Sequence, residues 1–138
     1  MLIDKSKIEL RKSISPKPKF LGFLKREFFQ SALVQWVLIA TIFLALSSWS
    51  ITIFFIRPVD LPLVLHYNVY LGVDIIGGWW QIYFLPAISS LFLVTNTVLA
   101  YLFYQKKERL GAYIFLLASF FVEAGTLIAI AGLVMINY

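Results

Sequence analysis

"SALVQWVLIATIFLALSSWSITIFFI", residues 31–56, contains no charged side chain from one end to the other. A helix needs about 20 consecutive apolar residues to cross a hydrocarbon layer of roughly 30 Å. The next two residues are Arg57 and Pro58, a cation that anchors a helix end and a ring that cannot continue the helix. The stretch therefore predicts a helix that spans a membrane.

Two further stretches have the same character, residues 82–104 and residues 110–136. Pro86 falls near the start of the first of them, where a missing backbone N–H costs little. The other stretch contains one charged residue, Glu123, and its many aliphatic and aromatic side chains outweigh the cost of inserting one acid. We therefore predict an all-α membrane protein with three transmembrane helices.

The composition supports this fold class and narrows the function. The 138-residue chain is 61% hydrophobic and only 14% charged, so a soluble domain would expose an implausible amount of apolar surface. The chain has no cysteine, which excludes disulfides, thiolate metal sites and cysteine nucleophiles. It contains one histidine and no glycine-rich phosphate loop or nucleophile elbow. We expect a non-enzymatic protein without a cofactor.

The basic residues are distributed unevenly. Residues 1–30 carry eight of the twelve Lys and Arg, and the turn "QKKER", residues 105–109, carries three more, whereas the stretch 57–81 has only Arg57. Because cytoplasmic loops are enriched in Lys and Arg, we predict a cytoplasmic N-terminus and an external C-terminus in the cytoplasmic (inner) membrane. The chain then divides into a cytoplasmic arm, 1–30, and a three-helix membrane domain, 31–138, with an external loop at 57–81.

Within the arm, the stretch "FLGFLKREFFQ", residues 20–30, has apolar residues at helical spacing. It predicts an interfacial helix that lies along the headgroups, with the arm attracted to anionic lipids of the inner leaflet. The arm shows no basic motif interleaved with aromatic residues in a folded domain, so nucleic acid is not an expected partner.

In the loop, polar and apolar residues alternate over residues 64–75, which is the period of a β-strand with one wetter face. An isolated strand cannot lie in lipid with unpaired backbone groups. We therefore expect a strand or hairpin outside the hydrocarbon layer, with Leu65, Tyr67 and Val69 against the helix ends. Three glycines are candidates for its turns, Gly72, Gly77 and Gly78.

The wetter face of this loop is a candidate site made of His66, Asn68 and Asp74. One histidine and few acids at this spacing match no recognised zinc or calcium pattern. We expect ordinary surface polarity there and no metal.

Glu123 lies near the centre of the third predicted span, at about the depth of two serine pairs, Ser47 and Ser48 on the first span and Ser89 and Ser90 on the second. Two interpretations of this candidate polar layer stay open. A neutral Glu123 would hydrogen-bond a neighbouring helix and hold the bundle together. A titrating Glu123 would belong to a proton or cation pathway, the default suspicion for an acid inside a membrane.

Another face of the third span carries small residues, Gly125, Ala129 and Gly132. Small side chains let a neighbouring helix approach closely. We therefore expect a homo-oligomer or other membrane subunits as partners.

The central part of the chain, about a third to a half of it, resembles the small bacterial membrane domain of unknown function that often precedes the SdpI-type immunity module. The resemblance rests on a spaced set of residues, Leu61-Pro62, His66-Tyr67-Asn68, Gly72, Asp74, Gly77 and Leu85-Pro86. It implies a bacterial-type membrane protein whose loop motif is a structural signature.

From these observations we predict a small integral membrane protein, a non-enzymatic structural or accessory subunit that acts through its helices and its loop. The first alternative is an oligomeric proton- or cation-coupled carrier or channel that uses Glu123. The second, which depends mainly on the resemblance, is an SdpI-like sensor or immunity protein that binds an external ligand at the loop.

Overall fold

The computed structural model describes residues 27–138, so residues 1–26, which make up most of the predicted arm and most of its predicted interfacial helix, lie outside the described residues. The elements follow the order α3 (Glu27–Gln30), α4 (Ala32–Phe55), β1 (Leu63–Asn68), β2 (Gly72–Gly77), the 3₁₀-helix η1 (Trp79–Tyr83), α5 (Phe84–Gln105) and α6 (Arg109–Asn137).

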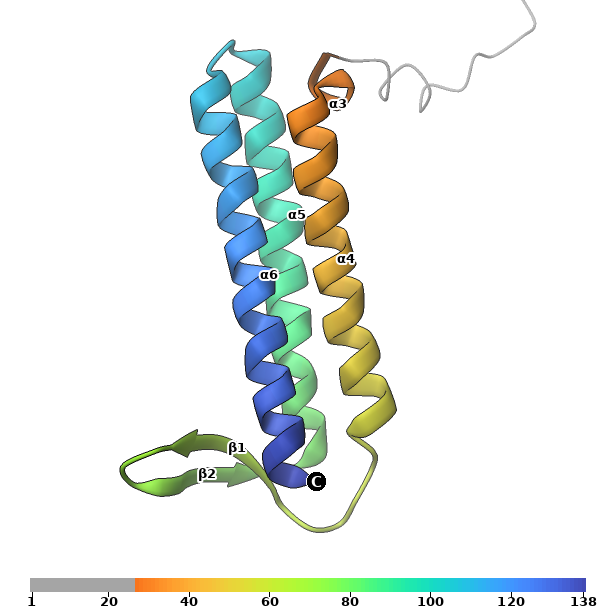
Figure 1. Ribbon diagram of the computed structural model, residues 1–138, viewed down its shortest axis with the longest axis vertical. Coiled ribbons are helices and arrows are strands. Elements are labelled where there is room, and N and C mark those ends of the chain that lie inside the picture. Colours follow the sequence, from red (N-terminus) through yellow and green to blue (C-terminus); the bar gives the residue numbers. More distant parts are fainter. Residues whose placement is uncertain (1–26) are drawn as a thin grey trace, which may run out of the picture.

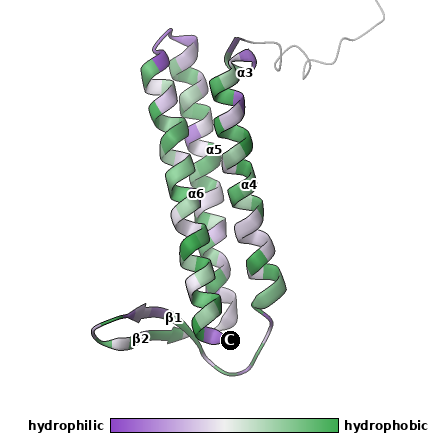
Figure 2. Cartoon of the chain, in the orientation of Figure 1, coloured by the Kyte–Doolittle hydropathy of each residue, from purple (hydrophilic) through white to green (hydrophobic). Residues whose placement is uncertain are grey.

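The three long helices lie side by side along the longest axis of the molecule (Figure 1), with α5 running opposite to α4 and α6. The segments Ala32–Phe55, Trp79–Gln105 and Arg109–Asn137 are each long and apolar enough to cross a membrane. The three predicted helices are confirmed to within a few residues at each end, and the chain fits a multi-pass membrane protein. Figure 2 shows hydrophobic residues along the helices and hydrophilic ones at the α5–α6 turn and on β1.

Local sequence explains the helix ends. The last backbone bond of α4 joins the Ile56 N–H to the Thr52 carbonyl, and Pro58 follows two residues later. Helix α5 ends with Lys107 at a φ of 65°, and the Glu108 N–H bonds back to the Phe103 carbonyl. This is the left-handed cap that often closes helices, here with lysine where glycine is usual. The capped turn joins α5 to the antiparallel α6.

Helix α6 is the centre of the bundle. It packs along both α5 and α4, whereas α4 and α5 have few direct contacts. Its buried residues recur at intervals of three, four or seven positions, the period of one helix face. They include Ala112, Leu116, Ser119, Glu123 and Ile130.

The bundle core has apolar ends and a polar middle. One apolar cluster contains Phe28, Val34, Ala100, Tyr104, Ala112 and Leu116. The other contains Ile56, Ile82, Ile130, Leu133 and Val134. The buried polar residues lie mostly between them along the helices, namely Thr41, Ser48, Thr52, Ser89, Ser119 and Glu123. The outward faces are strongly apolar, as a lipid environment requires, with Trp36 and Phe54 each 73% exposed.

The strands β1 and β2 form an antiparallel hairpin with an irregular register around His66. Its turn is completed by Gly72 at a φ of 79°, a conformation that favours glycine. The hairpin extends sideways from the bundle, next to the end of α6 (Figure 1). We call this the hairpin end, and the end with the α5–α6 turn the basic end.

The expected packing of Leu65, Tyr67 and Val69 against the helix ends is wrong for Val69, which is 83% exposed. Leu65 packs against the apolar cluster of the hairpin end, and Tyr67, which is 48% exposed, lines a hollow together with residues of α5 and α6. The physical reason is the direction of the hairpin. Because it extends sideways, only its base reaches the helices.

Candidate functional site

Glu123 lies in the polar middle of the bundle, on the face of α6 that is buried. Its side chain is 1% exposed, and its Oε2 lies 3.1 Å from the Ser89 Oγ on α5. The same Ser89 hydroxyl lies 3.2 Å from the carbonyl oxygen of Pro86. The Oε1 atom of Glu123 is buried and has no hydrogen-bond partner among residues 27–138. The structure therefore joins Ser89 and Glu123, two of the five residues of the predicted layer.

Ser90, the next residue on α5, is used differently. The indole Nε1 of Trp49 on α4 donates to its Oγ at 3.0 Å. Trp49 was not among the predicted site residues, although its place after Ser48 puts its ring at the same depth. The two bonds together connect all three helices at one level, α4 to α5 through Trp49 and Ser90, and α5 to α6 through Ser89 and Glu123.

The two serines of the pair on α4, Ser47 and Ser48, face different directions. Ser48 is fully buried, and no atom of the described part of the chain hydrogen-bonds its Oγ. Ser47 turns away and donates to the Phe43 carbonyl of its own helix at 2.8 Å. Because adjacent helical residues point about 100° apart, only one serine of such a pair can face the neighbouring helices.

The other buried hydroxyl groups hydrogen-bond within their own helices. Thr41, Thr52 and Ser119 each donate to the carbonyl four residues earlier, a bond that a helix interior commonly offers to these residue types. The polar atoms left over near the centre of the bundle are therefore the Glu123 Oε1 and the Ser48 Oγ, on two helices that pack together.

At the predicted loop site, the structure brings together His66 and Asp74. The His66 Nδ1 donates to the Asp74 Oδ1 at 2.7 Å across the two strands. This hydrogen bond lowers the pKa of Asp74 below its usual value, against a smaller opposing effect of burial. Asn68 instead accepts the Tyr70 N–H at 2.9 Å, which is a turn contact. Within residues 27–138, no three His, Asp or Glu side chains cluster closely enough to hold a metal ion.

Asn137, at the end of α6, holds the base of the hairpin. Its side-chain amide accepts the Val64 N–H at 2.8 Å and donates to the Val64 carbonyl at 2.9 Å. The amide thus pairs with the edge of β1 as a neighbouring strand would. Sequence reasoning missed this residue; the signal was an amide side chain at the end of an otherwise apolar span.

Two tyrosines complete the hairpin end. The Tyr83 hydroxyl donates to the Ile56 carbonyl at 3.0 Å, and the Tyr138 hydroxyl donates to the Phe55 carbonyl. Both acceptors lie where α4 ends, so their carbonyls have no partner further along that helix. Side chains from η1 and from the end of α6 therefore fix the start of the loop.

A hollow of about 300 Å³ lies between the hairpin base and the helices, lined by Leu65, Tyr67, Leu85, Ala129 and Gly132 among others. Two of these belong to the predicted small-residue face. A Cβ atom added at Gly125 or Gly132 would meet nothing within 4 Å. The described helices therefore leave the small-residue face uncovered, and the hairpin base borders it at Ala129 and Gly132.

Comparisons with protein-family models, curated proteins and solved structures find no match to this chain. The resemblance to the domain that precedes the SdpI-type module therefore stays a prediction.

Proposed function

We propose that the chain is a non-enzymatic accessory subunit of the cytoplasmic membrane, which acts through the open faces of its helices and through its hairpin. The observation that carries this proposal is the closed interior. Glu123 is 1% exposed and bonded across the α5–α6 contact, and it does not line the hollow between the hairpin base and the helices. An acid so enclosed serves better as a helix contact than as a transport site.

The geometry around Ser89 supports a neutral Glu123. The serine hydroxyl has one hydrogen, but two acceptors lie within reach, the Pro86 carbonyl and Glu123. A protonated Glu123 donates its own hydrogen to Ser89, which leaves the serine hydrogen for the carbonyl. Every short contact is then a proper hydrogen bond, and no charge is placed inside the membrane.

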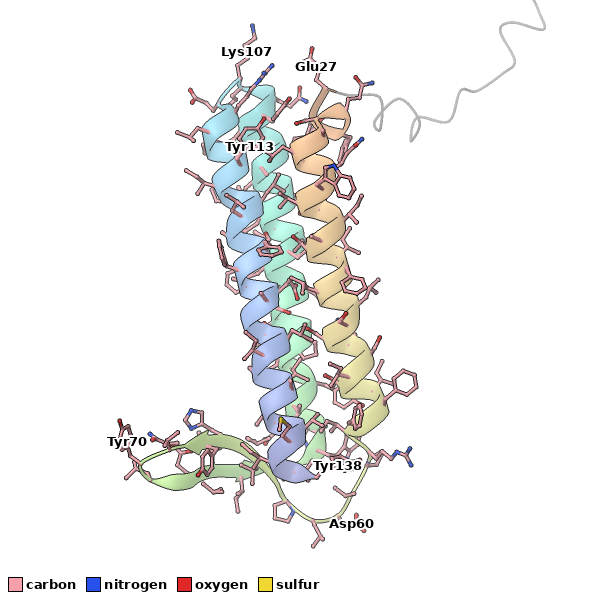
Figure 3. All side chains as sticks on the ribbon, in the orientation of Figure 1. Glu27, Asp60, Tyr70, Lys107, Tyr113 and Tyr138 are labelled. Carbon is pink, nitrogen blue, oxygen red and sulfur yellow. The ribbon has the colours of Figure 1, made fainter. Side chains whose placement is uncertain are left out.

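The charges support the proposed orientation. Lys106, Lys107 and Arg109 lie at the basic end, and Figure 3 shows Lys107 and Glu27 at the opposite end of the bundle from Asp60 and Tyr138. The predicted arm, residues 1–30, carries eight basic residues and ends with α3, whose Glu27 Figure 3 shows at this basic end. We place this end in the cytoplasm, with the arm against anionic lipids.

The proposed partner is a transmembrane helix, from a second copy of this chain or from another subunit, on the face of Gly125, Ala129 and Gly132. This face is open, and small residues permit close approach of helices. A photo-crosslinking residue at Ala129 should give one discrete adduct in native membranes. The same residue at Phe43, which is 68% exposed on α4, is the lipid-facing control and should give none.

The carrier alternative is favoured by one observation. The Glu123 Oε1 and the Ser48 Oγ are both buried without a hydrogen-bond partner among residues 27–138, on two helices that pack together. The carrier can be distinguished from the accessory subunit by measuring proton flux into liposomes that contain the parent chain or the Glu123→Gln variant. We expect neither to exceed empty liposomes. A flux in the parent that Glu123→Gln abolishes would establish the carrier and overturn the accessory role.

The sensor or immunity alternative is favoured by the His66–Asp74 contact together with the resemblance. His66 is 57% exposed at the side chain, so a ligand can reach it. An external ligand that binds the parent but not the His66→Ala variant would favour this alternative over the accessory role.

A further inference from the structure

We propose that the β1–β2 hairpin lies in the headgroup layer of the same membrane that the helices span, with its tip immersed among the lipids. The tip is formed by Val69, Tyr70 and Leu71, which are 83%, 94% and 77% exposed. The inference depends on the three spans and not on the accessory role.

The position of the hairpin places it at this level. It leaves the bundle sideways where α6 ends (Figure 1), and Figure 3 shows Tyr70 at the tip, far from the helices. If the helices span the bilayer, their ends mark the boundary between hydrocarbon and headgroups. The 3₁₀-helix η1 lies at the same end and carries Trp79, Trp80 and Tyr83, residue types enriched at this boundary.

The side chains of the tip, and most of those on β2, suit lipid better than water, whereas β1 is more hydrophilic (Figure 2). From residue 61 to residue 84 the only acid or base besides His66 is Asp74, and these two are bonded to each other. Beyond the tip, Val73, Ile75 and Ile76 are each about half exposed or more. So many exposed apolar side chains on one short hairpin are uncommon in water and mark contact with a membrane or a partner.

Many backbone hydrogen-bonding groups of the hairpin have partners, as a position at the membrane surface requires. The two strands pair with each other, the Asn137 amide satisfies the edge of Val64, and the Asn68 side chain satisfies the Tyr70 N–H in the turn. The outer strand edges still need water, because unpaired groups in hydrocarbon cost several kcal/mol each. The hairpin therefore lies among headgroups and does not enter the hydrocarbon centre.

The size of the tip favours lipid over a protein partner. A stable protein interface uses about 20–30 residues on each side, whereas the exposed tip offers three. A lipid surface requires no complementary shape, and tyrosine rings such as that of Tyr70 are well suited to the headgroup level.

The test uses the absence of cysteine from the chain, because a single introduced cysteine then carries a fluorescent label without background. Tyr70→Cys is labelled with an environment-sensitive dye in phosphatidylcholine–phosphatidylglycerol vesicles that contain the otherwise complete chain. The matched control is Asp60→Cys, an exposed position of the same end that Figure 3 shows beyond the helix ends.

We expect the Tyr70 label to emit at a shorter wavelength than the Asp60 label, to be quenched by spin labels near the lipid headgroups, and to resist aqueous iodide several-fold better. Leu71→Cys is the second probe if Tyr70→Cys folds poorly. Equal iodide quenching of the tip and control labels would overturn the proposal. A second result would also overturn it. If the tip label is protected from both quenchers in native membranes but fully quenched by iodide in the lipid vesicles, the tip is covered by a protein partner and not by lipid.

Discussion

The polar middle of the bundle and the hairpin each contain a bonded pair of polar side chains, but in opposite surroundings. In the bundle, Ser89 and Glu123 are buried and bonded between helices. In the hairpin, His66 and Asp74 are bonded to each other while their side chains remain 57% and 35% exposed. Loss of a buried partner leaves a polar atom with no replacement, whereas water replaces the partner of an exposed one. The difference predicts that the interior bonds control stability and the hairpin bonds control local order.

The largest effect on stability is expected when a cation is placed in the polar middle. Glu123→Lys introduces a buried ammonium group with no acid beside it among the described residues. We expect it to destabilise the bundle by about 3 kcal/mol or more, measured as unfolding in mixed micelles. Glu123→Gln, which keeps a group able to bond Ser89, should cost less than about 1 kcal/mol. Equal losses in the two variants would contradict a neutral, bonded Glu123.

The next effect is at the junction of the two regions. Asn137→Leu removes both bonds to Val64, so we expect a loss of about 1–3 kcal/mol in the local stability of the hairpin base, measured as faster amide exchange at residues 63–68. Asn137→Asp keeps the acceptor for the Val64 N–H but removes the donor, and should have an intermediate effect. Unchanged exchange in the leucine variant would mean that the amide does not hold the hairpin.

A smaller effect is expected from the Trp49–Ser90 bond, which can be isolated by a double-mutant cycle. We predict a coupling free energy of about 0.6 kcal/mol between Trp49→Phe and Ser90→Ala, the average for bonds between membrane helices. The control cycle combines Trp49→Phe with Ser47→Ala, whose hydroxyl bonds its own helix, and should show no coupling. A coupling equally large in the control would refute a specific contact.

The smallest effect is the pH response of the hairpin. The pKa of Asp74 is lowered in the folded protein by the hydrogen bond from His66. A lowered pKa means that the folded state binds the proton less tightly than the unfolded chain, so the stabilisation is present at neutral pH and is lost as the pH falls through the lowered pKa.

We therefore expect the His66 ring resonances to shift with loss of this bond as the pH is lowered from about 6 to about 2. Asp74→Asn provides the baseline, since it has no carboxylate to protonate. A bond that strengthens on acidification would show that the assigned sign is wrong.

Sequence alone was sufficient for the depth of the polar middle, because the three helices rise by the same 1.5 Å per residue and the apolar lengths fix their ends. It could not tell which of two adjacent serines faces inward, since that depends on the rotation of each helix against its neighbours. The division between Ser48 and Ser47, and the use of Ser90 by Trp49, follow from that packing.

For the hairpin, the sequence predicted the local structure but not its position relative to the helices. The alternation over residues 64–75 and Gly72 indicated strands and a turn, and both are present. The base of the hairpin is bonded to Asn137, 73 positions away from Val64 in the chain, and no local pattern contains such a contact. The exposed tip is a consequence of the sideways direction of the hairpin (Figure 1).

The central place of α6 has a consequence for biogenesis. Because α4 and α5 contact each other little and both pack on α6, the first two spans have few contacts besides the Trp49–Ser90 bond before the third is made. The third span brings Glu123 to Ser89 midway and Asn137 to Val64 at its end. We therefore expect the bundle to close, and the hairpin to be fixed, only after α6 has been synthesised.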